Sequence, residues 1–129
     1  NELEAYYDEA GIITIGVGHT GSDVEEGMTI TDSDSKALLR KDLRRFERAV
    51  NKEFPKGMRQ NEFDALFCLC YNIGCGAFAK SSLVKFINGG QTIEKIKVGF
   101  LMWTKAGGVV NKGLLNRRLA EYNEYAKIA

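Results

Sequence analysis

The chain has 129 residues, of which 44% are hydrophobic and 27% charged, and its formal net charge is +1. These values are typical of one compact globular domain, and the near-neutral charge argues against a nucleic-acid partner. No apolar run is long enough to cross a bilayer, so we expect no stable membrane insertion. The three closely spaced cysteines, Cys68, Cys70 and Cys75, are interpreted as buried reduced thiols, and we expect no metal and no cofactor.

Residues 1–30 are rich in glycine and β-branched residues, which predicts strands and turns. The segment Asp8–Gly11 is predicted to join a strand at Ala5–Tyr7 to a second strand, which gives a hairpin. In the second strand one face is apolar and the other is small and polar, with Thr14, Gly16 and Gly18 on the polar face. Alternating glycines in a strand indicate close approach by another backbone or by a ligand.

The rest of the chain is predicted to be helical throughout. A long helix begins at Thr31 and ends near Phe54, before Pro55, and carries apolar residues at helical spacing: Leu39, Leu43, Phe46 and Val50. A second helix ends at Gly74, and Ser81 caps a short one that ends at Gly89. Another helix starts at Thr92, and four of its residues are predicted to face inward: Ile93, Ile96, Phe100 and Leu101. The last helix runs from Lys112 to Ala126.

These elements predict an α+β fold with a single domain over 1–129. It would comprise a small β-rich lobe at about 1–30, a connecting helix at about 31–54 and a helical lobe at about 55–129. A cleft between two lobes is a natural place for a ligand.

Two residues of the hairpin suit the chemistry of a glycosidase. Asp8 lies in the predicted turn and Thr14 lies on the returning strand, so the hairpin brings them near each other. A carboxylate and a hydroxyl can together hold a water and accept its proton. The plainer alternative is that Asp8 bonds its own backbone in the turn. His19 is the only histidine, and we expect it to hold a neighbouring carboxylate or carbonyl.

Motifs along the whole chain resemble one family. Tyr6-Tyr7-Asp8, Gly11 and Thr14–Gly21 resemble the active-site hairpin of the phage-type lysozymes, the endolysins of the glycoside hydrolase family that includes bacteriophage T4 lysozyme. The compact small lobe is more similar to endolysins of lambdoid phages than to the T4 protein. Further matches follow in the family's order: Leu38–Leu43, Asn61–Leu66, Tyr71–Gly74, Phe78 with Ser81–Leu83, Trp103 with Ala106–Gly108, and Gly113-Leu114 with Arg117-Arg118.

The resemblance implies a muramidase that cuts the β-1,4 bond from N-acetylmuramic acid to N-acetylglucosamine in peptidoglycan, with inversion. It implies that Asp8 and Thr14 position the attacking water and that His19, Gly16 and Gly18 support the site. It further implies glycan contacts at Thr20, Tyr71, Asn72 and Ser81. A monomer would wait in the host bacterial cytoplasm and act on peptidoglycan in the periplasm or cell wall.

The chain departs from the family at the general acid. The resemblance places this glutamate nine positions before Asp8, which falls upstream of Asn1, and the helix that carries it is missing as well. Glu2 and Glu4 do not match its position and are interpreted as exposed charges. We expect that the acid lies on a preceding segment and that the 129 residues alone are nearly inactive. The alternatives are a catalytically inactive peptidoglycan-binding module and a lytic transglycosylase.

Two groups of basic residues have a simpler interpretation. The basic helix from Lys36 to Lys52, like Arg117 and Arg118, is interpreted as a solvated surface. Trp103 has apolar neighbours in the sequence, which favours core packing over stacking on a sugar.

Overall fold

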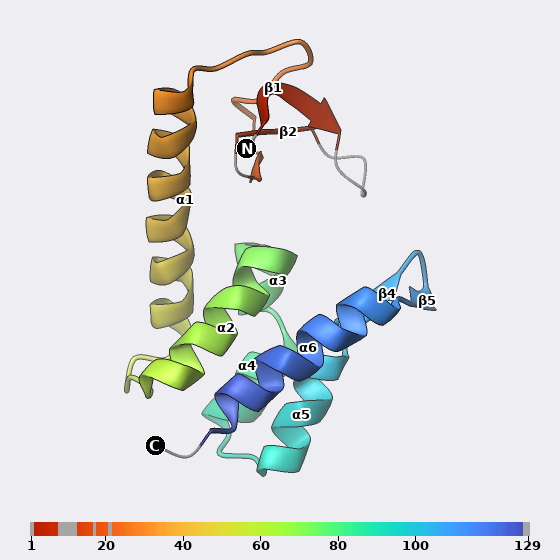
Figure 1. The fold of residues 1–129 in the computed structure, drawn as a ribbon. Coiled ribbons are helices and arrows are strands. Elements are labelled where there is room, and N and C mark those ends of the chain that lie inside the picture. The colour runs from red at the N-terminus through yellow and green to blue at the C-terminus, as the bar shows by residue number, and fades with distance from the viewer. Residues whose placement is uncertain (1, 8–12, 17, 21, 128–129) are drawn as a thin grey trace. The chain divides into compact units, whose positions relative to one another are not determined.

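The structure is a computed structural model, and it describes residues 2–7, 13–16, 18–20 and 22–127. The chain divides into two compact units, Asn1–Arg45 and Phe46–Ala129, and each is described by itself. Figure 1 shows strands in the first unit and a group of helices in the second. The predicted α+β class is confirmed.

Unit 1 contains a three-stranded antiparallel sheet in the order β1-β2-β3. Its strands are β1 at Glu2–Tyr7, β2 at Ile13–Gly16 and β3 at His19–Thr20. The other edge of β1 is covered by residues 28–30, because the Ala5 amide donates to the Met28 carbonyl and the Ile30 amide donates to the Leu3 carbonyl. The sheet edge next to β1 is therefore satisfied by the chain's own backbone.

The long helix α1 spans Asp32–Glu53 and begins in unit 1. Its first turn is capped by Thr31, whose hydroxyl accepts from the Asp34 amide at 3.0 Å, while Asp34 accepts from the Thr31 amide. Acidic residues in the first turn also suit the positive end of the helix dipole. The predicted helix from Thr31 to Phe54 is confirmed to within one residue at each end.

Unit 2 contains the end of α1, five further helices and a small hairpin among its described residues (Figure 1). The elements are α2 at Gln60–Ile73, α3 at Cys75–Ala79, α4 at Ser82–Asn88, α5 at Ile93–Leu101, β4 at Lys105–Ala106, β5 at Val109–Val110 and α6 at Lys112–Tyr125. The main hydrophobic cluster of the described residues lies in this unit, around Phe46, Leu69, Phe78, Leu83 and Phe100, while Ile15 and Val24 are buried in unit 1.

Side-chain caps fix the starts of three helices in unit 2. Ser81, Thr92 and Asn111 accept hydrogen bonds from the backbone amides of Val84, Lys95 and Leu114. At the other end of α6, Asn61 of α2 lies within 3.1 Å of three carbonyl oxygens, those of Glu124, Tyr125 and Lys127. The caps predicted at Ser81 and Thr92 are confirmed, as is the end of α2 at Gly74.

Some predictions of burial are wrong. Ile93 is 40% exposed, because it is the first residue of α5 and precedes the turn that faces the core. Leu101, which was also predicted to face inward, is half-buried. Cys68 is exposed and Cys75 half-buried, so only Cys70 is a buried thiol as predicted, although none of the three cysteines forms a disulfide.

Two further features of unit 2 differ from the prediction. The helical prediction missed the β4–β5 hairpin, whose turn uses Gly107 and Gly108 at φ values of 59° and 82°. Arg118 is completely buried rather than solvated: its Nη2 donates to Glu121 Oε2 at 2.8 Å, and its Nε lies 2.7 Å from Glu121 Oε1. The ion pair within α6 is what permits a guanidinium in this position.

Candidate active site

The β1–β2 pairing defines the surroundings of Thr14. Tyr6 pairs with Thr14, Tyr7 pairs with Ile13, and Thr14 also pairs with Thr20 on β3. Thr14 is therefore on the central strand of the sheet, and it is buried. The catalytic prediction at Asp8 falls outside the described residues, so the pairing of Tyr7 with Ile13 is the nearest described register to it.

The two glycines of β2 and the following turn have positive φ values, 66° at Gly16 and 73° at Gly18. A Cβ at Gly16 would lie only 3.1 Å from Ser35 Oγ on α1. The neighbour at Gly16 is thus a side chain of α1 and not the backbone or ligand that was predicted, and a ligand near these glycines stays a prediction.

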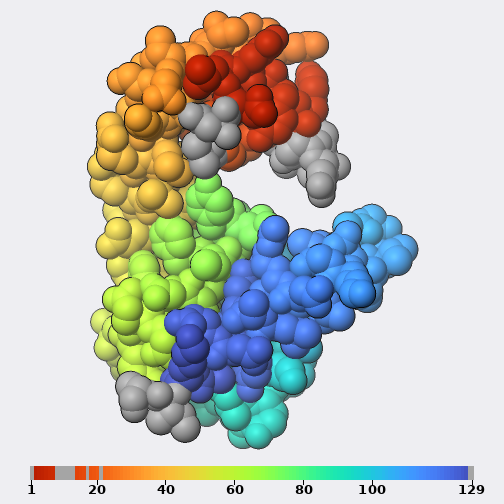
Figure 2. All heavy atoms as spheres, viewed as in Figure 1, coloured from red at the N-terminus to blue at the C-terminus, as the bar shows by residue number. Residues whose placement is uncertain are grey.

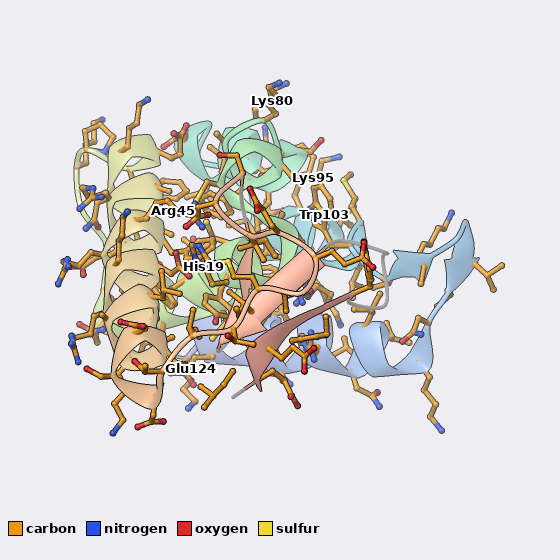
Figure 3. The ribbon with its side chains drawn as sticks, turned by 90° about the horizontal axis from the view of Figure 1, so that it is seen from above. His19, Arg45, Lys80, Lys95, Trp103 and Glu124 are labelled. Carbon is orange, nitrogen blue, oxygen red and sulfur yellow. The ribbon has the colours of Figure 1, made fainter. Side chains whose placement is uncertain are left out.

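His19 (Figure 3) is the first residue of β3, and its buried side chain contacts α1. Its Nδ1 lies 2.8 Å from Asp42 Oδ2 on α1, and its Nε2 lies 3.0 Å from Asp23 Oδ2 in the following loop. A neutral imidazole carries one N–H and can donate to only one carboxylate, so two such contacts require the imidazolium form. The prediction that His19 holds a neighbouring carboxylate is confirmed.

The electrostatic balance at His19 agrees with this geometry. Burial alone lowers the pKa of His19, but hydrogen bonds with Asp42 and then Asp23 outweigh it, so the pKa lies above its ordinary value of 6.5. In return, the hydrogen bond with His19 lowers the pKa of Asp23. Sequence reasoning missed both acids; the signal available was an aspartate four residues after His19 and another among apolar positions of α1.

A pocket of about 360 Å³ opens beside His19 within unit 1. Its lining is mainly apolar and includes Ile15, Val24 and Leu38, while Asp23 and Lys41 add charge. Of the residues predicted for the site, His19 alone contributes to its described lining. The pocket therefore lies on the side of His19 that faces α1.

The remaining predicted glycan contacts belong to unit 2. Tyr71 and Asn72 are exposed near the end of α2, and the ring of Tyr71 lies 5.0 Å from that of Phe46. Ser81 is buried, and its hydroxyl donates to the Phe78 carbonyl at 2.7 Å while it caps α4. The structure brings together Thr14, Gly16, His19 and Thr20 in unit 1, and a glycan contact at Ser81 stays a prediction.

No group of three or more His, Cys, Asp or Glu side chains suited to a metal ion is found in the described ranges. No helix in the described part of the chain is long and apolar enough to cross a membrane. The site as described offers hydroxyl, imidazolium and carboxylate groups.

The phage lysozyme family model matches residues 1–121. The chain belongs to the phage lysozyme family. This result confirms the resemblance found in the sequence motifs, and the lysozyme-like fold is confirmed with it.

Individual members of the phage lysozyme family and solved structures are similar over most of the chain. The endolysin of Bacillus phage PZA is 44% identical over 108 residues, which are 84% of this chain and 42% of that protein. The chain thus spans less than half the length of that relative. The endolysin from Escherichia coli O157:H7 phage FAHEc1 has a TM-score of 0.74 and 39% identity, over 98% of this chain and 84% of that one. The muramidase domain of SpmX from Asticaccaulis excentricus has a TM-score of 0.77 and 33% identity, over 98% of this chain and 88% of that one.

Proposed function

We propose that the protein is a peptidoglycan hydrolase that acts on the bacterial cell wall as a monomer. The observation that carries the proposal is the phage lysozyme match over residues 1–121. The names of two similar proteins, an endolysin and a muramidase domain, support it. The bond cut is the β-1,4 link from N-acetylmuramic acid to N-acetylglucosamine.

In this proposal Asp8 and Thr14 position the attacking water. Asp8 follows Tyr7 in the sequence, and the neighbouring Tyr6 pairs with Thr14. The carboxylate accepts a proton from the water while the hydroxyl orients it. Attack on the anomeric carbon from the side opposite the leaving oxygen inverts the configuration.

The other groups of unit 1 have supporting roles in the proposed mechanism. The imidazolium of His19 ties β3 to α1, and the close approach of Gly16 to Ser35 fixes β2 against the same helix. Together they hold the strand that carries Thr14. Thr20, the β3 partner of Thr14, and Tyr71, Asn72 and Ser81 are proposed to contact the glycan.

An inverting glycosidase also needs a carboxylic acid that protonates the leaving oxygen. The family resemblance assigns this role to a glutamate nine positions before Asp8, outside the 129 residues. The activity test therefore uses the protein expressed from its complete reading frame.

The test is hydrolysis of purified peptidoglycan by the Asp8→Asn and Thr14→Val variants. Loss of a positioned base lowers kcat by about 10²- to 10⁴-fold, so Asp8→Asn should show a loss of this size. Asp32→Asn, an exposed aspartate at the start of α1, is the matched control and should keep full activity. Proton NMR of the first product should show the inverted anomer.

Three results would contradict the proposal in different ways. Full activity of Asp8→Asn would show that the water is held elsewhere. Anhydro-sugar products would indicate a lytic transglycosylase. Saturable binding to peptidoglycan without new reducing ends would indicate an inactive binding module.

A further inference from the structure

One segment of unit 2 carries an excess of positive charge, as does the basic helix from Lys36 to Lys52. Residues 80–112 contain six lysines and one glutamate, a net charge of +5, although the whole chain has a net charge of only +1. All six lysines are exposed, and Figure 3 shows Lys80 pointing outward from the helices of unit 2. The surface over this segment is therefore strongly cationic, whereas the rest of the chain is net acidic.

The same segment exposes large apolar side chains. Five are exposed between residues 93 and 110, and the only other exposed large apolar side chain in the described part of unit 2 is Tyr71. Val109 is 70% exposed and Val110 is 55% exposed, which is unusual for adjacent valines. The five residues are Ile93, Val98, Met102, Val109 and Val110. Exposed apolar groups that cluster among charges indicate a contact surface.

Helix α5 arranges these groups in a stripe. Val98 and Met102 are four residues apart and share a face of the helix, while Ile96 and Phe100 are buried. Val98 and the C-cap residue Met102 thus expose apolar side chains on one side of α5.

Two lysines flank this stripe, one on each side. Lys95 Nζ lies 4.8 Å from the ring centroid of Phe86 on α4, and Lys97 Nζ lies 5.5 Å from that of Tyr122 on α6. Long lysine side chains can lie along apolar surface and extend their ammonium groups to a polar boundary. An apolar stripe with lysines on both flanks suits a helix that lies at a water–lipid boundary.

The β4–β5 hairpin continues the surface directly after α5. Figure 2 shows it standing out from the surface of unit 2, and the Asn111 amide closes its base by donating to the Thr104 carbonyl at 2.8 Å. Val110 pairs with Lys105, and Lys112 follows at the start of α6. The hairpin therefore exposes two valines, with one lysine opposite Val110 and another directly after the hairpin.

We propose that this lysine–valine surface docks on an anionic lipid bilayer as a peripheral contact. We define the surface by Val98, Met102, Val109 and Val110 with Lys97, Lys105 and Lys112. The lysines complement anionic headgroups, and the four apolar side chains leave water for the acyl boundary. Phosphate-rich polymers and nucleic acids would satisfy the charge but offer no apolar layer for the valines. The inference goes beyond the proposed hydrolase, since the docking needs no glycan and no catalytic group.

The test is co-sedimentation of the full chain with vesicles of phosphatidylglycerol and phosphatidylcholine, compared with vesicles of phosphatidylcholine alone. We expect binding to the mixed vesicles only. Lys105→Gln/Lys112→Gln should weaken the partition coefficient about thirtyfold, since each lysine near an anionic surface contributes about a factor of five. Val109→Ser/Val110→Ser should weaken it about tenfold or more.

Matched controls lie outside the surface and keep the same residue types. Lys52→Gln/Lys56→Gln removes two exposed lysines at and after the end of α1, and Leu43→Ser removes an exposed apolar residue of that helix. Circular dichroism shows whether each variant stays folded. Equal loss of binding in these controls, or no loss in Val109→Ser/Val110→Ser, would overturn the proposal; the latter result would leave a purely electrostatic surface. Absence of binding to the mixed vesicles would overturn it outright.

Discussion

His19 contacts two carboxylates at once, and this arrangement makes unit 1 sensitive to pH. The folded state holds the proton more tightly than the unfolded chain, because the pKa of His19 is raised in the folded protein. The resulting stabilisation is fully present below the ordinary histidine pKa of 6.5 and is lost as pH rises through the raised value.

We predict that His19→Gln lowers the stability of unit 1 at pH 5 to 6 and has a progressively smaller effect at alkaline pH. The reason is that glutamine has no titratable group, so the variant lacks the stabilisation that protonated His19 gives at low pH and that the unmodified protein itself loses at high pH. Chemical denaturation across a pH series, followed by circular dichroism, measures the difference. Asp23→Asn removes one of the two carboxylates and should give a smaller change of the same sign. A loss for His19→Gln that is the same at every pH would contradict the imidazolium assignment.

Arg118 and Glu121 form the buried ion pair of α6, and their energetics differ from those of His19. Burial raises the pKa of Glu121 to about 7, although Arg118 acts in the opposite direction. Arg118 Nη1 has no hydrogen-bond partner among the described residues. The desolvation of both groups is therefore only partly compensated.

We predict that Arg118→Met lowers the free energy of unfolding by about 3–5 kcal/mol, because it leaves a buried carboxylate without its partner. The double variant Arg118→Met/Glu121→Met should recover most of this loss. Urea titrations of the two variants at pH 8 provide the comparison. If the double variant is as unstable as the single one, the loss arises from packing and not from the unpaired charge.

His19 and Arg118 show which side-chain contacts could not be predicted from the sequence. As the only histidine, His19 was predicted to hold a carboxylate or carbonyl, but the identity of Asp42 depends on how α1 lies against the sheet. Arg118 was interpreted as solvated because a charged residue next to Arg117 is usually exposed. Only its pairing with Glu121 three residues later permits burial.

The packing of α5 against α4 depends on a glycine in the middle of a helix. Gly99 is buried, and a Cβ there would lie 2.9 Å from Leu83 Cδ1 and 3.0 Å from Leu83 Cα. The short contact with a backbone atom means that the helices themselves would have to separate. The absence of a side chain at Gly99 therefore sets how closely α4 and α5 approach.

We predict that Gly99→Ala destabilises unit 2 by about 1–3 kcal/mol, the usual cost of overpacking. This outcome opposes helix propensity, which favours alanine by about 1 kcal/mol. Gly76→Ala in α3 is the matched control, because nothing lies within 4 Å of its added Cβ, and it should be neutral or stabilising. Thermal unfolding of both variants gives the comparison. A stabilising Gly99→Ala would show that α4 and α5 separate easily.

Among the helices and strands, the sequence predicted those whose starts are marked by a local pattern of residues. Helix α1 has apolar spacing and a capping residue at Thr31, and α4 and α5 have capping residues at Ser81 and Thr92, so their starts are local features. The β4–β5 hairpin was missed because strands of two residues are too short for an alternating pattern, although Gly107-Gly108 marks the turn.

The whole molecule divides into two units, and the main hydrophobic core lies in the second. That core lies between Phe46 and Tyr125, whereas the described polar network of unit 1 centres on His19. From the sequence, the family and the α+β fold were predictable because motifs run along the entire chain. The division within α1, between Arg45 and Phe46, was not predictable, because no change in helical pattern marks it.

We predict that Cys70 reports on unit 2 alone. Cys70 is completely buried in the core, while Cys68 is exposed. Thiol labelling in the native state should therefore modify Cys68 first and Cys70 only after unit 2 opens. His19→Gln should change the Cys70 labelling rate by less than about twofold, because this core contains no residue of unit 1. Mass spectrometry of peptides identifies each thiol. A large increase at Cys70 would show that both units unfold together.

Trp103 is the only tryptophan in the chain, and it lies half-buried between the end of α5 and the β4–β5 hairpin. All intrinsic indole fluorescence of these 129 residues therefore originates from the segment that joins α5 to the hairpin. A blue shift on contact with an apolar phase, or quenching by a brominated lipid, would report on that surface without any label. The sequence thus carries its own optical probe in the segment that, among the described residues of unit 2, exposes apolar side chains and lysines together.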